Sequence, residues 1–283
     1  MSEPAALAAV VGVLGLLVGS FLNVVILRLP ARLAHEWRTQ SREVLELDTP
    51  AGETAPPDLV FKGSHCPKCG RALSWWENIP LVSFALLRGR CRSCRTPISW
   101  QYPAVELATG LASATVAWHF GPSAAGAVVL VATWMLIALC GIDLRTQLLP
   151  DQITLPLLWL GLLAATAAVL VDARAAIFGA AAGYLVLWSV YWAFKLLTGK
   201  EGMGYGDFKL LGALGAFVGW KGIVPILLLS SVIGAITGSI WLAARGRDRA
   251  TPIPFGPYLA AAGWVQILWG PALLDAYARH AGL

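Results

Sequence analysis

Long apolar stretches run through the sequence, and the first of them constrains the fold most. No charged residue occurs between Glu3 and Arg28, so 24 consecutive positions are neutral. At 1.5 Å per residue, a helix of that length spans the roughly 30 Å hydrocarbon core of a bilayer. A cleaved signal peptide fits less well, because the n-region lacks Lys or Arg and no small-residue cleavage site follows. We therefore expect a retained transmembrane helix.

Seven further apolar stretches favour an all-α polytopic membrane protein with about eight transmembrane helices in the lipid bilayer. They are residues 104–120, 124–142, 153–171, 175–197, 208–219, 223–244 and 255–274. Charged residues make up 13% of the chain, about half the share in a soluble protein. This composition disfavours soluble, disordered and disulfide-rich secreted classes. Because stretch 208–219 has only 12 residues, we expect a half-helix or re-entrant piece whose loose end is buried in protein or meets water.

The Lys and Arg residues predict the orientation of these helices. With the N-terminus outside, 18 of the 21 positive residues fall on the cytoplasmic side, and only Arg174, Lys221 and Arg279 fall outside. Positive residues gather in cytoplasmic loops, so this bias predicts a multi-pass protein with its N-terminus outside. The bias also accounts for the pI of about 9.1 without a nucleic-acid partner.

This topology divides the chain into three predicted domains. Residues 1–27 form the first transmembrane helix, residues 28–103 the one sizeable cytoplasmic segment, and residues 104–283 a membrane-embedded core. Within the cytoplasmic segment, residues 45–58 are rich in Pro, Gly and acidic residues, which is typical of a flexible loop.

Four of the five cysteines form two C-x2-C pairs separated by 21 residues. Four thiolates at this spacing can close tetrahedrally on one zinc ion, and a segment with little core gains folding energy from such a metal. The predicted ligands are Cys66, Cys69, Cys91 and Cys94. A redox dithiol and free thiols stay open as alternatives. Four cysteines leave no need for His65 as a ligand, and the lone Cys140 is expected to be a small buried hydrophobe.

Four carboxylic acids occur in or at the ends of the apolar stretches, where ionisable groups are costly and indicate function. They are Glu106, Asp143, Asp151 and Asp207, all on the predicted cytoplasmic side. Asp151 follows a proline and precedes a helix, so capping alone is its favoured role. Asp143 closes a helix, where the macrodipole opposes a negative charge, and this position favours a functional role.

Two carboxyl groups that share a site can perform acid–base catalysis. One stays protonated because both cannot ionise easily, while the ionised one takes a proton from water. The helix dipole favours the anion at Asp207, in a first turn, and the neutral acid at Asp143, in a last turn. We therefore expect Asp143 to carry the shared proton. Gly202, Gly204 and Gly206 leave the backbone free to take positive φ and let an extended peptide approach.

Two functions of other classes stay open. A proton-coupled membrane transporter would use the buried carboxylates as a relay, but a carrier favours sites near the bilayer midplane, between repeats, and no inverted repeat is visible. A non-catalytic zinc-bearing assembly protein would not need Asp143 and Asp207 to meet.

These segments resemble the bacterial type IV prepilin peptidases (leader peptidase/N-methyltransferases), which are membrane aspartic proteases of the GxGD type. The matching segments are GSFLNVVILRLP (19–30), HCPKCG (65–70), RCRSC (90–94), WWENIPLVSFALLRGRC (75–91), ISWQYPAVEL (98–107), IDLRTQLLPD (142–151) and GMGYGDFKLLGALGAFVGW (202–220). The resemblance implies that Asp143 and Asp207 are the catalytic pair and that the glycines before Asp207 are those of GxGD. Glu106 and Asp151 are expected to support the substrate or the motif.

The resemblance also implies two reactions at the cytoplasmic face of the bacterial inner membrane. The first cleaves the leader from type IV prepilins and type II secretion pseudopilins. The second N-methylates the new N-terminal residue with S-adenosylmethionine. No G-x-G-x-x-G follows a strand here, so methylation rests on the resemblance alone, and a peptidase without it stays open. The candidate region, where the zinc loop meets the first span, contains Asn23, Arg28, Glu77, Asn78 and Gly89.

Overall fold

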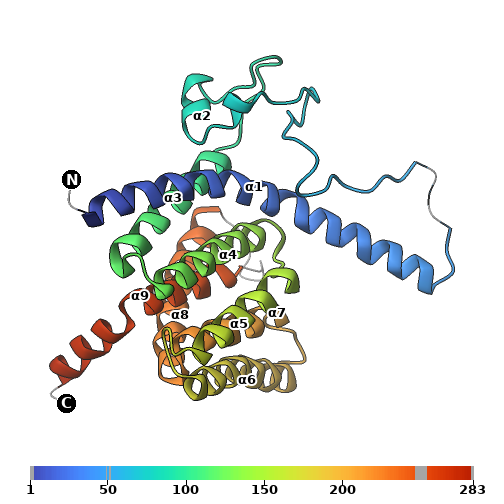
Figure 1. Cartoon of the computed structure of the whole chain (residues 1–283). Helices are drawn as coiled ribbons and strands as arrows, with labels where there is room; N and C mark the ends of the chain where they lie inside the picture. Colours follow the sequence, from blue (N-terminus) through green and yellow to red (C-terminus); the bar gives the residue numbers. More distant parts are fainter. Residues whose placement is uncertain (1–2, 49, 51, 246–253, 282–283) are drawn as a thin grey trace. The chain divides into compact units, whose positions relative to one another are not determined.

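The computed structural model describes residues 3–48, 50, 52–245 and 254–281, and the regular secondary structure of these residues is helical (Figure 1). No β-strand forms among them, only two isolated bridges that pair His65 with Ala72 and Arg90 with Pro97. The helices are α1 (Glu3–Val44), η1 (Trp75–Asn78), α2 (Val82–Leu86), α3 (Gln101–Phe120), α4 (Ala124–Thr146), α5 (Asp151–Thr166), α6 (Ala173–Thr198), α7 (Tyr205–Val218), η2 (Trp220–Gly222), α8 (Ile223–Arg245) and α9 (Gly256–Ala281). The predicted all-α class is confirmed.

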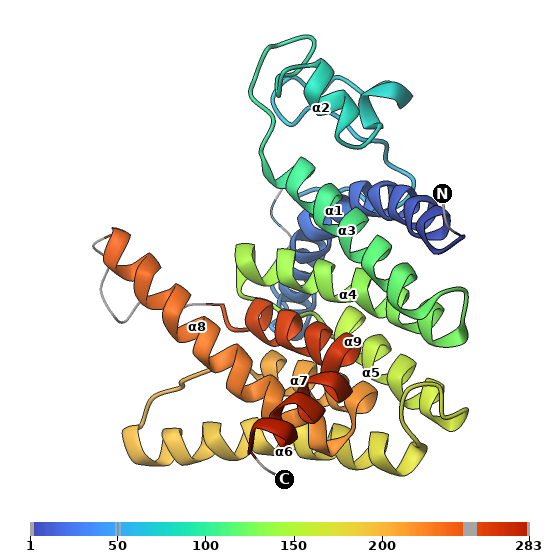
Figure 2. The ribbon, with the colours of Figure 1, turned by 90° about the vertical axis from the view of Figure 1, so that its left-hand side faces the viewer.

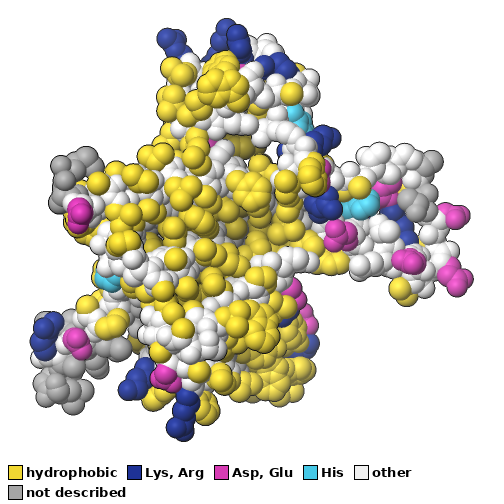
Figure 3. All heavy atoms as spheres, viewed as in Figure 1, with side chains coloured by type: hydrophobic (Ala, Val, Ile, Leu, Met, Phe, Trp, Pro, Cys, Tyr) yellow, Lys and Arg dark blue, Asp and Glu magenta, His cyan; other side chains and the backbone are white. Residues whose placement is uncertain are grey.

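Four described helical segments are long and apolar enough to cross a bilayer: α1, α4, α6 and Trp220–Ile240, which consists of η2 and most of α8. A helix also covers most or all of each of the other predicted stretches, but the count of about eight spans stays a prediction. Hydrophobic side chains cover much of the visible surface of α3 to α6 (Figure 3), as lipid contact requires. Residues 246–249, which contribute to the positive-charge bias, lie outside the described residues.

The chain forms two compact units, Met1–Trp118 (the first unit) and His119–Leu283 (the second unit). The boundaries expected at 27/28 and 103/104 divide the chain by side of the membrane, and they stay predictions. Each unit has its own packing and is described by itself.

In the first unit, α1 is one continuous helix of 42 residues, about 63 Å long. It continues 17 residues past the expected end of the first span. Its transmembrane part packs closely on α3, because a Cβ placed on Gly15 would lie 2.8 Å from the Thr109 carbonyl oxygen. The described residues of the loop expected at 45–58 contain no helix.

In the second unit, α4, α5 and α6 follow one another from top to bottom in both views (Figures 1 and 2). The short α7 packs on α5, α6 and α9, and residues 210–217 are all buried. Helices α6 and α7 touch backbone to backbone, since a Cβ on Gly179 would lie 2.2 Å from the Gly215 carbonyl oxygen. At 14 residues, α7 is about 21 Å long. The expectation of a short helix whose end is buried in protein agrees with this packing.

Candidate active site and metal centre

Asp143 and Asp207 line the same cavity of about 680 Å³ in the second unit. Its wall is made by the end of α4, the start of α7 and the segments 147–149, 201–204 and 254–255. Both side chains are buried, with exposed fractions of 4% and 7%. The structure therefore brings together two acids that lie 64 positions apart in the sequence.

The two acids lie at the helix positions expected from the sequence. Asp143 is in the last turn of α4, which ends at Thr146 and is followed by Gln147 in the left-handed conformation (φ 55°). Asp207 is the third residue of α7. The dipole argument for the shared proton therefore keeps its geometric basis.

Gly256, at the first position of α9, was not predicted as a site residue. Its backbone N–H donates a buried hydrogen bond to Asp143 Oδ2 at 3.0 Å. A donor of this kind favours the ionised carboxyl group and so works against the expectation that Asp143 carries the proton. No sequence signal pointed to Gly256, because any residue except proline supplies a backbone N–H.

The expectation of positive φ is wrong for the three glycines before Asp207, and Gly206 acts instead through close packing. Gly202, Gly204 and Gly206 are absent from the glycines with positive φ in the described chain, and Gly204 is the N-cap of α7 with φ −84°. A Cβ on Gly206 would lie 2.7 Å from Leu149 Cβ. Gly206 is therefore needed for the space beside Leu149.

Asp151 does not cap a helix, which corrects the role expected from the sequence. It is the first residue of α5, and the N-cap position belongs to Pro150 without a side-chain cap. Both Asp151 oxygens lie 2.7 Å from Lys209 Nζ, so the side chain ties the start of α5 to α7. Asp151 is not among the residues that line the cavity.

Glu106 belongs to the first unit and has a structural partner there. Its buried carboxylate accepts the backbone N–H of Leu81 at 2.9 Å. This bond joins α3 to the segment just before α2, so the geometry gives Glu106 a role in shaping the first unit.

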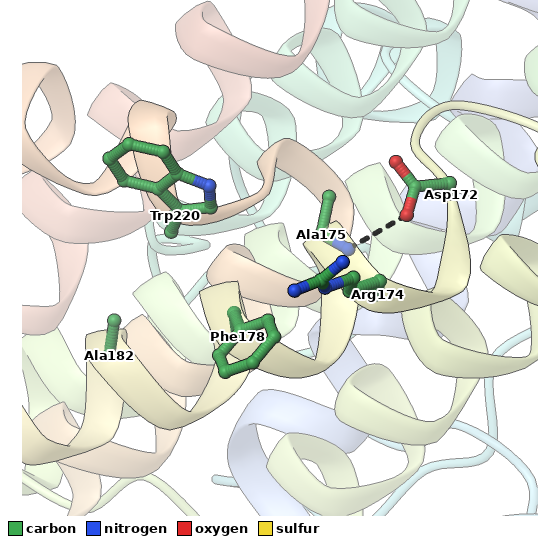
Figure 4. Close-up of a pocket in the computed structure, with 6 residues that line it drawn as sticks. All are labelled: Asp172, Arg174, Ala175, Phe178, Ala182 and Trp220. Carbon is green, nitrogen blue, oxygen red and sulfur yellow. Dashed lines mark hydrogen bonds between the residues drawn. The ribbon is translucent and has the colours of Figure 1, made fainter.

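A second cavity, of about 520 Å³, lies at the N-terminus of α6 (Figure 4). Its only acid is Asp172, whose carboxylate accepts the Ala175 N–H at 3.0 Å as the helix N-cap. The Arg174 guanidinium lies over the Phe178 ring, 5.8 Å from its centroid. This cavity has no pair of acids and is not a candidate for the same chemistry.

The four predicted metal ligands of the first unit meet at one point. The sulfur atoms of Cys66, Cys69, Cys91 and Cys94 all lie within 4.8 Å of one another. The Sγ atoms of Cys66 and Cys94 are 3.7 Å apart, close to the separation of about 3.8 Å that a tetrahedral site with 2.3 Å zinc–sulfur bonds requires. These cysteines can therefore hold a metal ion.

Each C-x2-C pair sits in a tight turn closed by backbone hydrogen bonds. The Cys66 N–H donates to the Arg71 carbonyl at 2.9 Å, and the Cys91 N–H donates to the Thr96 carbonyl at 2.8 Å. The residue after each second cysteine has positive φ, 69° at Gly70 and 58° at Arg95. Both halves thus present their sulfur atoms in the same way.

The thiols of this cluster differ in pKa because their neighbours differ. Backbone N–H groups, first that of Cys69, lower the pKa of the Cys66 thiol, and the Thr96 hydroxyl lowers the pKa of Cys94 to about 6. Although the Arg71 N–H works in the other direction, the neighbouring thiols raise the pKa of Cys69 to about 11. Four thiols this close cannot all ionise unless a cation lies between them.

The residues considered for methylation make contacts within the first unit. Asn23 is buried and donates to the Tyr102 carbonyl at 3.1 Å. Arg28 donates to the carbonyl oxygens of Asp58 and Lys62, both at 2.7 Å. These bonds give both side chains a structural role, since they join α1 to the chain before and after the cysteine segment, residues 66–94.

Comparison with known proteins gives consistent matches along the chain. Residues 13–120 match the Bacterial Peptidase A24 N-terminal domain, and residues 130–239 match the Type IV leader peptidase family. A protein of Xanthomonas campestris pv. campestris is 58% identical over 95% of this chain and 94% of its own length. A protein of Stutzerimonas stutzeri is 53% identical over 100% of this chain and 97% of its own length. A protein of Pseudomonas aeruginosa is 52% identical over 99% of this chain and 97% of its own length.

All three relatives are named prepilin leader peptidase/N-methyltransferase. No solved structure matches the chain. The similarity covers both units, including the acid pair and the cysteine cluster.

Proposed function

The chain belongs to the type IV leader peptidase family, and we infer that it is a prepilin leader peptidase/N-methyltransferase whose catalytic pair is Asp143 and Asp207. The observation that carries this assignment of residues is the convergence of two buried carboxyl groups, from α4 and α7, on one cavity. A transporter relay or a non-catalytic assembly role does not account for the family, so both alternatives are set aside.

The cavity supports peptide hydrolysis by an acid pair that shares one proton. The water oxygen attacks the scissile carbonyl carbon while the ionised carboxylate takes a proton from that water. The protonated carboxyl group donates its proton to the carbonyl oxygen. The C–N bond of the resulting diol then breaks as one carboxyl protonates the leaving nitrogen and the other takes the hydroxyl proton. The pair ends with one proton, as it began.

The test replaces each acid by its amide. Asp143→Asn and Asp207→Asn should each lower the rate of prepilin cleavage by at least 10²-fold, since positioned proton transfers contribute about 10²–10⁴-fold. Asp275→Asn is the matched control, because Asp275 is an exposed acid of α9 outside the cavity. Cleavage at the parent rate by either amide variant would show that the pair is not catalytic.

In this proposal the four clustered cysteines hold a structural zinc ion. Zinc binding supplies folding energy to the segment 28–103. The measured metal content should be one zinc per chain, and Cys140→Ala should not change it. Cys66→Ser should lose the metal and expose residues 28–103 to limited proteolysis while the membrane helices stay assembled. Equal protection of that segment in Cys66→Ser and the parent would refute the zinc-dependent fold.

The methyl donor in this proposal is S-adenosylmethionine, and the acceptor is the N-terminal amine that cleavage creates. A labelled methyl donor, incubated with the enzyme and prepilin, should label the mature pilin. Asp207→Asn should prevent labelling of full-length prepilin but not of a synthetic peptide that begins at the mature N-terminus. Cleavage without any label would leave a peptidase alone.

Both reactions belong at the cytoplasmic face of the inner membrane, with type IV prepilins and type II secretion pseudopilins as substrates. Three features support this placement: the positive-charge bias, the apolar surfaces of the helices and the location of the acid pair at helix ends that this topology assigns to the cytoplasmic side.

A further inference from the structure

We propose that Gly256 is a positioning residue of the peptidase site, whose N–H and missing side chain together hold the Asp143 carboxylate in place. The inference rests on the proposed catalytic role of Asp143. Gly256 lies outside the residues 130–239 that match the leader peptidase family, so it adds α9 to the helices that build the site.

A buried hydrogen bond joins Gly256 to the Asp143 carboxylate. The Gly256 N–H donates to Asp143 Oδ2 at 3.0 Å, and the bond is buried. Gly256 is the first residue of α9, and the first N–H groups of a helix have no partner within it. Asp143 supplies that partner, so the carboxylate and the helix end satisfy each other.

Position 256 has no space for a side chain. A Cβ on Gly256 would lie 2.7 Å from Asp143 Oδ2 and 3.1 Å from Leu149 Cδ2. Contacts under 3.0 Å require something to move. Leu149 is itself buried and is confined by Gly206, where a Cβ would lie 2.7 Å from Leu149 Cβ.

Moving α9 away to make that space would break its contacts with α4 and α7. The Trp264 indole N–H donates to the Thr133 hydroxyl of α4 at 3.0 Å. At Gly263 the backbone of α9 lies so close to α7 that a Cβ would be 2.4 Å from Leu214 Cδ2. Because α9 and Leu149 are both tightly packed, we expect a side chain at position 256 to displace the Asp143 carboxylate, its nearest neighbour at 2.7 Å.

The ionisable groups around Asp143 come from three places. Asp207 faces it from α7 and Cys140 from the preceding turn of α4, and Glu201 and Tyr205 line the same cavity. Removing the Gly256 N–H changes none of these four side chains. A pH profile can therefore detect the effect of the Gly256 hydrogen bond on Asp143.

The experiment compares Gly256→Ala with Gly270→Ala on the same helix, where the three atoms nearest to the new Cβ all belong to the Gln266 side chain, with Nε2 the closest at 2.5 Å. Gly256→Ala should lower kcat for prepilin cleavage by at least 10-fold, leave KM within about 2-fold, and move the acid limb of the kcat/KM profile to higher pH. Gly270→Ala should behave as the parent does.

A backbone ester at position 256, made by incorporating glycolic acid, removes the N–H without adding a Cβ. It should move the acid limb in the same direction with a smaller loss of kcat. Methylation of a peptide that begins at the mature N-terminus reports that each variant is folded, and the ester keeps the test valid if Gly256→Ala fails to fold.

The outcomes separate this inference from the proposed function. Parent-like kcat and pH profile in Gly256→Ala, or in the ester, overturn the inference while Asp143→Asn remains inactive. Cleavage by Asp143→Asn overturns the proposed function itself.

Discussion

The single residue Leu149 packs between the two helix starts, of α7 and α9, that border the peptidase site. Its side chain lies between Gly206 at the start of α7 and Gly256 at the start of α9, and a Cβ on either glycine would come within 3.1 Å of it. Both glycines therefore serve packing around one buried leucine, next to the two acids.

The two glycines of GxGD should differ in their tolerance of alanine. Gly206→Ala forces Leu149 to move, at a cost of about 1–3 kcal/mol in folding free energy. Because Leu149 packs beside the Asp143 carboxylate at Gly256, its movement should also lower cleavage by at least 10-fold. Gly204→Ala should have the smaller effect, since the nearest atom to its Cβ is 3.9 Å away and alanine adopts φ −84° without strain. Initial cleavage rates of the two variants check this order, and a larger loss in Gly204→Ala would contradict it.

Glu77 should stabilise the cysteine segment only above acidic pH. Arg71 and the Ser74 N–H hold the pKa of this buried carboxyl below its usual range. Its contribution is therefore present above the unfolded-state pKa of about 4.3 and is lost as the pH falls through the lower folded value.

Glu77→Gln tests this sign. The variant should lose protection of residues 28–103 from proteolysis at pH 7, and the difference from the parent should shrink in acid, as assayed with an acid-tolerant protease. A difference that grows as the pH falls would contradict the assigned charge state.

The residues that sequence alone could predict are those whose chemistry depends on side-chain type. Two C-x2-C pairs and two acids at helix ends can be recognised because few other residues serve there. Gly256 could not be found in this way, because its contact uses a backbone N–H across 113 positions. The Lys209 partner of Asp151 was missed for a related reason, since the pair forms only when α5 and α7 pack together.

At the scale of helices, hydropathy predicted where apolar helices occur but not where they end. Helix α1 continues to Val44 through a polar stretch that no membrane requires, with an ion pair between Arg32 and Glu36 at i, i+4. Helix α5 ends at Thr166, before the expected end at 171. Such ends depend on tertiary packing and local pairs, which average hydropathy does not record.

The ion pair between Asp151 and Lys209 should be a modest clamp between α5 and α7. The Lys209 and Asp151 side chains are 33% and 49% exposed, and pairs this exposed contribute about 0–1 kcal/mol. Asp151→Asn should therefore lower thermal stability slightly and keep cleavage within about 3-fold of the parent. Loss of cleavage beyond 10² in a folded Asp151→Asn protein would show that Asp151 takes part in the chemistry.

At the scale of the whole molecule, α6 relates the two cavities to the two sides of the membrane. One cavity lies at its N-terminus and the other beyond its C-terminus, beside Glu201, and its 26 residues extend about 39 Å. We therefore predict that the acid pair and the cavity lined by Arg174 face opposite sides of the bilayer.

Reporter fusions test this topology. Alkaline phosphatase joined after Pro122 should be active, because this position is predicted to face outward, and the same enzyme joined after Lys200 should be inactive. Activity after Lys200 with inactivity after Pro122 would invert the orientation and place the acid pair on the outer face.

The long α1 has a consequence for the part of the chain that follows it. Past position 27 the helix extends about 26 Å further. The chain then returns, and Arg28 binds the carbonyl oxygens of Asp58 and Lys62. Nearer the end of the helix, Arg42 pairs with Glu53. The excursion is an arm closed at its base, and residues near the tip can be added or removed without disturbing the point where the cysteine segment begins. Evolution can thus alter the reach of the arm while the metal centre keeps its attachment.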